Sequence, residues 1–309
     1  MSQTTDGPVG GPSPLPDRTA LIGALYAVGA FGTWGVLPIY FKIMEETPPA
    51  EILAHRIVWS ALLVGLMLKA LGRWREVRAI LENRRLMMWL CVSSVLLSGN
   101  WMLFIWAVTN GYILQGSLGY YINPMVNVVL GVVLLGERLS WAQWTAVGLS
   151  AIGVGVLAFG LGEFPWIAVS LALMFGFYGY VRKTAPAGAA TGLFVETLVV
   201  VLPAFGYLMF LGWNGDGAFG AKSWGYDLLL IFGGVITASP LIMFTAAARR
   251  LRYATVGLFQ YLAPTMQFLV AVFVFGEAFT DAHKITFCMI WVALAIYSAD
   301  TFMARRRAA

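Results

Sequence analysis

Charged side chains are scarce in this sequence. Asp, Glu, Lys and Arg make up 11% of the 309 residues, while apolar residues make up 60%. A soluble domain carries about 25% charged residues, because its surface must be hydrated. A chain this apolar needs the lipid bilayer as its solvent. The composition therefore excludes an ordinary soluble protein and indicates an integral membrane protein.

Residues that build disulfides and metal sites are also scarce. The chain has two cysteines, Cys91 and Cys288, each inside an apolar run, and two histidines, His55 and His283. Neither H-E-x-x-H nor G-x-x-x-x-G-K-[ST] occurs, and no loop is long enough for a nucleotide-binding domain. We therefore expect no metal, no cofactor, no disulfide framework and no ATPase. Nucleic-acid binding is not expected either, because no basic face alternates with aromatic residues.

Long apolar runs are what the sequence has instead. A spanning helix needs about 20 apolar residues. Residues 1–18 are rich in Pro, Gly, Ser and Thr and are predicted to form a disordered tail. A short linker at 181–192 separates two groups of runs. The predicted spans are 19–41, 53–71, 86–107, 113–136, 141–160, 165–181, 191–212, 227–247, 255–276 and 284–303.

The basic residues predict the orientation of the chain. With ten spans, both termini and every second loop share one side of the membrane. Most of the 20 Lys and Arg fall on that side, including those in 69–85 and in the tail at 304–309. The opposite side holds Lys42, Lys222 and Lys284. Because Lys and Arg accumulate in cytoplasmic loops, both termini are predicted to lie in the cytoplasm, with the protein in the inner (plasma) membrane.

The chain also repeats itself. Residues 118–142 match residues 258–282 at a constant separation of 140, so that Tyr121, Pro124 and Glu137 meet identical residues. Both segments share the uncommon spacing Pro-x11-Gly-Glu. The repeat extends across loops, which argues against chance similarity of apolar helices.

The repeat predicts the architecture. One half is expected at 19–160 and the other at 161–303. Each holds five spans, an odd number, so the second half must be inverted relative to the first. The predicted fold is an all-α integral membrane protein with ten transmembrane helices in two inverted five-helix repeats. Inverted repeats of this kind are common in transporters, with the substrate site near the bilayer midplane.

Several motifs resemble those of a known family. The sequence resembles the drug/metabolite transporter superfamily, with two EamA-type halves, and within it the RarD family. The resemblance covers nearly the whole chain between its two tails. It implies a transporter, with export favoured over uptake, but it does not specify a cargo. The motifs are GTWGVLPIYFK at 32–42, EILAHRIVWS at 51–60, SGNWMLFIWAVTNG at 98–111, GYYINPMVNVVLGVVLLGERLS at 119–140, GLFVET at 192–197 and LFQYLAPTMQFLVAVFVFGE at 258–277.

His55 and Arg56 lie inside the second predicted span, and Glu196 lies inside the seventh. Ionisable groups are costly in a membrane and usually face a cavity or a partner. Arg56 and Glu196 are equivalent in the repeat, so inversion places Arg56 in the outer third and Glu196 in the inner third. We therefore expect two vestibule charges and no direct ion pair. The alternative is a snorkelling side chain or a structural hydrogen bond.

Prolines and polar residues supply further candidates. A proline inside a helix frees the carbonyl four residues earlier, which must then meet water, protein or ligand. The predicted helix kinks are Pro38, Pro124, Pro240 and Pro264. The further substrate-binding candidates are Trp34, Asn100, Trp101, Tyr121, Asn123, Asn127, Gln260 and Gln267. The alternative for the amides is interhelical hydrogen bonding.

The predicted function is a secondary transporter, or permease, that moves a small metabolite or drug-like molecule by alternating access. A channel or facilitator is one alternative, although rings of like charge are absent. A membrane-embedded enzyme is another, although it would need converging His, Asp or Glu groups. Glu196 or His55 could couple transport to protons, and facilitated diffusion is equally consistent. The expected partners are the small-molecule cargo and the lipid bilayer; the sequence leaves the oligomeric state open.

Overall fold

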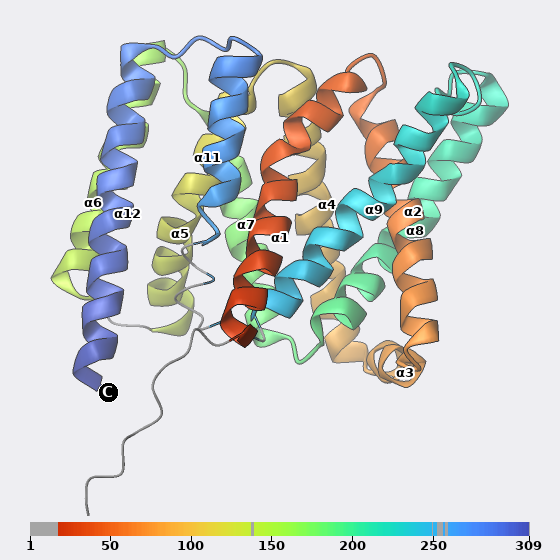
Figure 1. Ribbon diagram of the computed structural model, residues 1–309, viewed down its shortest axis with the longest axis horizontal. Helices are drawn as coiled ribbons and strands as arrows, with labels where there is room; N and C mark the ends of the chain where they lie inside the picture. The colour runs from red at the N-terminus through yellow and green to blue at the C-terminus, as the bar shows by residue number, and fades with distance from the viewer. Residues whose placement is uncertain (1–17, 137–138, 249, 252–255, 257–258, 309) are drawn as a thin grey trace, which may run out of the picture.

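The computed structural model describes residues 18–136, 139–248, 250–251, 256 and 259–308, and every regular element within them is a helix (Figure 1). The predicted disordered tail lies almost entirely outside these residues, as does Glu137. The elements are α1 (Arg18–Ile43), α2 (Pro49–Ala70), α3 (Trp74–Glu82), α4 (Arg84–Thr109), α5 (Ile113–Leu135), α6 (Trp141–Leu161), α7 (Trp166–Thr184), α8 (Ala189–Asn214), α9 (Trp224–Ala248), α11 (Leu262–Leu269), the π-helix η1 (Val270–Val274) and α12 (Asp281–Ala308).

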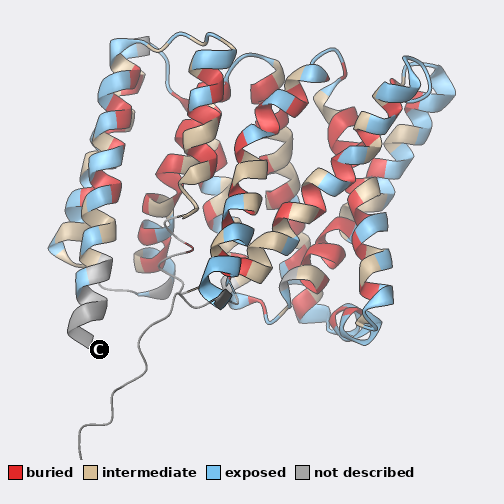
Figure 2. Ribbon diagram, viewed as in Figure 1, coloured by how far each residue is buried: buried red, intermediate tan, exposed pale blue. Residues whose placement is uncertain are grey.

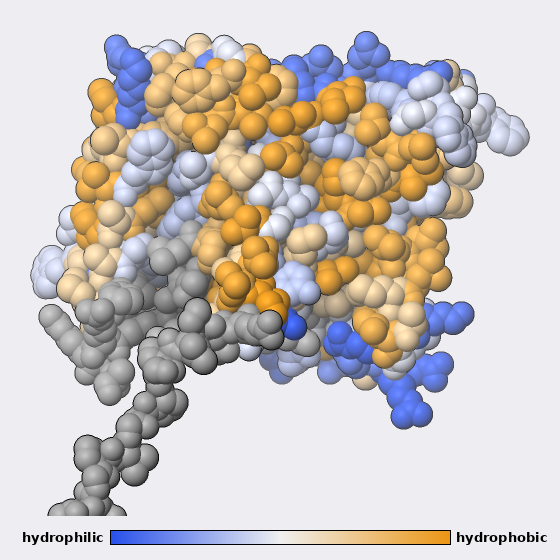
Figure 3. All heavy atoms as spheres, viewed as in Figure 1, coloured by the Kyte–Doolittle hydropathy of each residue, from blue (hydrophilic) through white to orange (hydrophobic). Residues whose placement is uncertain are grey.

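The helices match the predicted apolar runs in position. Eight are long and apolar enough to cross a membrane, and two shorter apolar segments lie at Trp166–Arg182 and Leu262–Val274. Hydrophobic residues cover the middle of the visible face, and hydrophilic residues gather at its upper and lower edges (Figure 3). Apolar side chains facing outward are stable in lipid rather than water. The structure therefore confirms an all-α, multi-pass membrane protein.

Two ends of the molecule can be distinguished in Figure 1. The upper end carries segments 44–48, 215–223 and 275–280, and the lower end carries α3 and segment 185–188. Helices α2 and α9 both begin at the upper end and pack against each other. Helices α4 and α8 both begin at the lower end and also pack against each other.

The central helices form one packed body, whereas α6 and α12 form a pair at its edge (Figure 1). Helix α1 packs on α9 and α11, while α7 packs on α4 and α5. Buried residues are densest where these central helices face one another (Figure 2). The α6–α12 contact relies on small residues: the hydroxyl of Thr286 donates to the carbonyl of Gly153 at 2.8 Å. Close approach of this kind is typical of helices packed within lipid.

Helix α3 is absent from the predicted spans, because the sequence predicts a basic loop between the spans 53–71 and 86–107. Its sequence is amphipathic: Val77 and Ile80 are buried, while Arg75 and Arg78 are exposed. A spacing of three to four residues between apolar positions places them on one helical face. The spacing of the apolar residues indicates this helix, but the many basic residues around them also fit a loop.

The predicted span 255–276 also differs from the structure. The chain turns at 260–261, α11 follows, and the helix then widens into the π-helix η1. Pro264 is the third residue of α11, where a missing N–H costs little because first-turn N–H groups have no helical partner. Pro38, Pro124 and Pro240 lie inside α1, α5 and α9. Pro124 and Pro264 are equivalent in the repeat but differ in position: Pro124 lies inside α5, whereas Pro264 lies in the first turn of α11.

Candidate functional site

Arg56 lies inside the packed body, although it carries a charge. It follows Pro49, the first residue of α2, by seven residues, which is about 10 Å from the upper end of the helix. The residue is 4% exposed. Its Nε donates to the hydroxyl of Thr237 in α9 at 3.0 Å. The rings of Phe41 and Trp101 lie 5.1 and 5.0 Å from its Cζ.

The charge of Arg56 is not neutralised by the described part of the chain. No carboxylate there pairs with it, and its terminal nitrogens Nη1 and Nη2 make no hydrogen bond to the described residues. An unpaired buried ion costs several kcal/mol. Each ring contact offsets about 0.5–2 kcal/mol of that cost. The buried charge of Arg56 therefore lowers the stability of the protein unless another group pairs with the guanidinium.

Glu196 lies in α8 and is fully enclosed. It follows Ala189, the first residue of α8, by seven residues, about 10 Å from the lower end. The hydroxyl of Ser93 donates to its Oε1, and the hydroxyl of Ser94 donates to its backbone carbonyl at 2.6 Å. Arg182 places its Nε 3.6 Å from Glu196 Oε1. Unlike Arg56, Glu196 therefore has an opposite charge beside it.

The Arg182–Glu196 pair is not fully satisfied. Within the described chain, Glu196 Oε2 and Arg182 Nη1 are both buried without a hydrogen-bond partner. Buried polar atoms are costly when unpaired. Arg182 is not among the predicted site residues, because the sequence predicts a linker at 181–192, whereas α7 continues to Thr184.

His55 belongs to the upper end rather than to the surroundings of Arg56. Its Nδ1 accepts a hydrogen bond from Trp59 Nε1 at 3.3 Å, and its ring stacks on Phe219 at 5.3 Å. Its Nε2 lies 3.9 Å from Oε1 of Glu51, and that oxygen accepts the N–H of Ala218 at 2.7 Å. These contacts hold segment 215–223 against the start of α2.

Other polar contacts also close the upper end. Lys222 forms an ion pair with Glu46 at 2.8 Å, and its ammonium holds the pKa of Glu46 below its usual range. Both oxygens of Glu277 accept backbone N–H groups, from Ile113 and Leu114, at 2.7 Å each. A carboxylate at a helix N-terminus binds N–H groups that lack helical partners. Each of these contacts joins a residue before 161 to one after it.

Two of the candidate amides make hydrogen bonds between helices. Asn100 and Asn123 donate to the carbonyls of Leu171 and Ala172 in α7, each at 3.1 Å. Asn127 donates to Asn123 at 3.0 Å, within α5. The bonds of Asn100 and Asn123 are those expected under the structural alternative, and a cavity-lining role for the three amides stays a prediction.

The remaining candidates lie in α1, α4, α5, α11 and the turn before α11. Gln267 donates to the carbonyl of Trp34 at 3.0 Å, while its Oε1 is buried without a partner in the described chain. The hydroxyl groups of Tyr121 and Thr265 lie 2.6 Å apart. Gln260 is half-buried in the turn before α11. Of the eleven substrate-binding candidates, Trp101 lies directly against Arg56.

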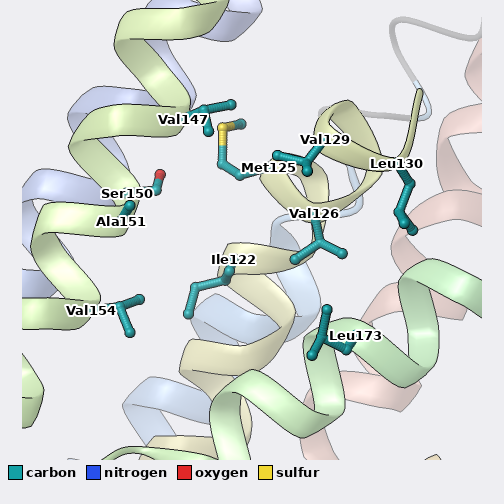
Figure 4. A pocket seen from close by; sticks show the side chains of 10 residues that line it. All are labelled: Ile122, Met125, Val126, Val129, Leu130, Val147, Ser150, Ala151, Val154 and Leu173. Carbon is teal, nitrogen blue, oxygen red and sulfur yellow. The ribbon is translucent and has the colours of Figure 1, made fainter. Parts of the chain in front are cut away.

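Two cavities lie away from both charged sites. One of about 200 Å³ lies between α5, α6 and α7 and is lined by apolar side chains such as Ile122 and Val126, together with Ser150 (Figure 4). The other, of about 360 Å³, is lined by residues that include Tyr121 and Trp291. Both lie where the α6–α12 pair meets the rest of the molecule. Their place fits loose packing at the edge of the molecule, and the first cavity has an apolar lining apart from Ser150.

Comparisons with known proteins identify the family. The model of the EamA-like transporter family matches residues 21–159. An uncharacterized transporter of Vibrio cholerae is 46% identical over 278 residues, 90% of this chain and 92% of its own length. Protein RarD of Escherichia coli is 43% identical over 285 residues, covering 92% of this chain and 96% of its own length. The chloramphenicol-sensitive protein RarD of Pseudomonas aeruginosa is 31% identical over 293 residues, covering 93% and 97%.

A likeness in fold agrees with this assignment. A protein of known crystal structure superimposes with a TM-score of 0.58 at 19% identity, over 94% of this chain and 99% of its own length. That likeness concerns the fold alone. The sequence relatives show more: this chain is a membrane transporter of the EamA-like family and belongs, within the drug/metabolite transporter superfamily, to the RarD family.

Proposed function

We propose that this protein is a secondary transporter of the inner membrane that works by alternating access between two inverted five-helix halves, 19–160 and 161–303. Both termini then lie in the cytoplasm, so the lower end is cytoplasmic and the upper end is external. Export is the proposed direction, in line with the family resemblance. The cargo is a small molecule that meets Arg56 on one side and the Glu196 region on the other.

Two equivalent contacts between the halves support this proposal. Arg56 of α2 packs against Gly233 of α9, where an added Cβ would lie 2.9 Å from its Cγ. Glu196 of α8 accepts a hydrogen bond from Ser93 of α4. Adding 140 to 56 and to 93 gives 196 and 233, so equivalent positions meet equivalent positions. Two halves related by an inverted repeat are expected to make such paired contacts at opposite depths.

These contacts define two interfaces between the halves. The upper interface joins α2 to α9, and the lower interface joins α4 to α8. At the upper interface an added Cβ on Gly234 would lie 2.6 Å from the carbonyl carbon of Trp59, so the backbones touch. The equivalent residue at the lower interface is Ser94, whose side chain fits between the helices. A carrier that opens the two interfaces in turn needs two contacts that can each separate.

Counterflow tests the transport mechanism without knowledge of the cargo. The purified protein is reconstituted in liposomes loaded with ¹³C-labelled cytosolic extract, and the exit of labelled metabolites is followed by mass spectrometry. We expect unlabelled extract outside to accelerate the exit of the cargo, because a loaded carrier reorients to exchange one molecule for another. Arg75→Gln, at an exposed position of α3, should behave as wild type. Exit at the same rate with and without external extract would indicate a channel.

Topology tests the orientation and the ten-span count. In a background with Cys91 and Cys288 replaced by serine, we expect Arg78→Cys to be labelled only from the cytoplasm and Asn214→Cys only from outside. Arg78 lies in α3 and Asn214 ends α8 at the opposite end of the molecule. Impermeant maleimide on intact cells and on inverted vesicles makes the measurement. Labelling of both positions from the same side would exclude the proposed arrangement.

A further inference from the structure

Within the packed body of the described chain, Arg56 is a buried cation with no counter-charge and with only one of its N–H groups in a hydrogen bond. Glu196 has Arg182 beside it, Glu51 accepts the N–H of Ala218, and Glu277 accepts two N–H groups. One N–H of Arg56 donates to Thr237, and the other four N–H groups, on Nη1 and Nη2, make no hydrogen bond to the described residues. These two nitrogens are not among the fully buried atoms without a partner in the described chain, so each keeps some solvent-accessible surface.

We propose that Arg56 binds a carboxylate of the cargo, and that the substrates of this transporter are small monocarboxylates, zwitterionic ones included. The planar guanidinium presents two parallel N–H groups that match the two oxygens of a carboxylate. The rings of Phe41 and Trp101 lie about 5 Å from Cζ and hold the group in place, so its fork is organised before the cargo arrives. The inference rests on the proposed transport function, because it names the cargo class of that site.

The charge at the site limits the cargo to one negative group. A phosphate monoester carries a charge of about −1.5 to −2 near neutrality, which a single guanidinium would leave partly unpaired. Among the described residues no second cation lies against Arg56; its polar neighbours are Thr237 and the phenols of Tyr40 and Tyr120. Phenols are neutral near pH 7. A cationic cargo would be repelled, and a neutral amide would leave the charge uncompensated.

The test is a binding measurement that does not require transport. Purified protein in nanodiscs is heated with three matched pairs of probes: acetate and acetamide, benzoate and benzamide, phenylalanine and phenylalaninamide. We expect at least one carboxylate to raise the melting temperature with an apparent affinity about 10- to 150-fold above that of its amide, the factor that a charged hydrogen bond contributes. The three pairs differ in the group attached to the carboxylate, so a preference for the carboxylate does not depend on one particular side group.

Variants of Arg56 assign the effect to this residue. Arg56→Gln should abolish the preference for the carboxylate, and Arg56→Lys should retain a weaker preference, because an ammonium keeps the charge but lacks the fork. Arg75→Gln, exposed on α3, is the matched control and should keep the full preference. If Arg56→Gln does not fold, the weaker carboxylate preference expected of Arg56→Lys provides the test.

Three results would overturn the inference: equal affinity within every pair, no shift with any carboxylate up to millimolar concentration, or a preference that survives in Arg56→Gln. Failure of counterflow together with a preference that depends on Arg56 would remove the transport mechanism but leave the carboxylate site. Counterflow without any carboxylate preference would support the transport mechanism but exclude the carboxylate site. The two proposals therefore fail separately.

Discussion

Replacing Arg182 with methionine is expected to lower the free energy of unfolding by about 3–5 kcal/mol, the usual cost of removing one partner from a buried ion pair. Glu196 would lose the guanidinium that lies 3.6 Å from its Oε1, and its Oε2 already has no partner among the described residues. The carboxylate would then be held only by Ser93. Thermal unfolding of the purified protein measures the loss.

Arg56→Met is the control for this prediction, because it removes the same charge from a position that is more deeply buried than Arg182. Arg56 has no carboxylate partner in the described chain, so its removal leaves no orphaned charge. We expect no loss beyond about 1 kcal/mol, and a gain is consistent with replacing a buried ion by an apolar side chain. The double variant Arg182→Met/Glu196→Gln should recover most of the stability. Equal losses in the two methionine variants would refute the difference in pairing described above.

Gly234→Val is expected to hold the upper interface open. Its Cβ alone would lie 2.6 Å from the carbonyl carbon of Trp59 and 2.9 Å from the backbone N of Ser60. Overpacking of this kind costs about 1–3 kcal/mol. That cost falls on the state in which α2 and α9 touch, so the equilibrium should shift about 5- to 150-fold towards the state open at the upper end. Counterflow should slow by a similar factor.

Two other substitutions control for the size of valine. Gly206→Val introduces the same side chain in α8, where nothing lies within 4 Å of the new Cβ, and it should leave counterflow unchanged. Ser94→Val adds bulk at the equivalent position of the lower interface and should shift the equilibrium in the opposite direction. A similar slowing in Gly206→Val would mean that valine disturbs the helix rather than the interface.

Much of the fold was predictable from sequence because the bilayer imposes a simple requirement. A helix exposed to lipid must be apolar for about 20 residues, and that pattern located the long helices. The shorter segments were harder to predict. Helix α3 is amphipathic and basic, so it was counted with the loops, and the turn at 260–261 interrupts an apolar run without any charge to mark it.

The candidate site was predictable where a charge interrupts an apolar run. Arg56 and Glu196 were identified in this way, and both are buried. Their partners were not identified, because Ser93, Ser94 and Thr237 are small hydroxyl residues that occur in many membrane helices without special roles. Arg182 lies two residues before Thr184, the last residue of α7, where a charge looks like part of a loop. Partners of this kind depend on which helices meet, and an apolar pattern does not encode that.

The most direct test of alternating access is the labelling of one cysteine at each interface. Ser60→Cys reports on the upper interface and Ser94→Cys on the lower one; both serines are buried, and Cys91 and Cys288 are replaced by serine. Impermeant maleimide is applied from each side of the membrane, with and without Gly234→Val. Alternating access predicts that Gly234→Val speeds labelling of Ser60→Cys from outside and slows labelling of Ser94→Cys from the cytoplasm. Faster labelling at Ser60→Cys with no change at Ser94→Cys would show that the two interfaces open independently, and would contradict the account.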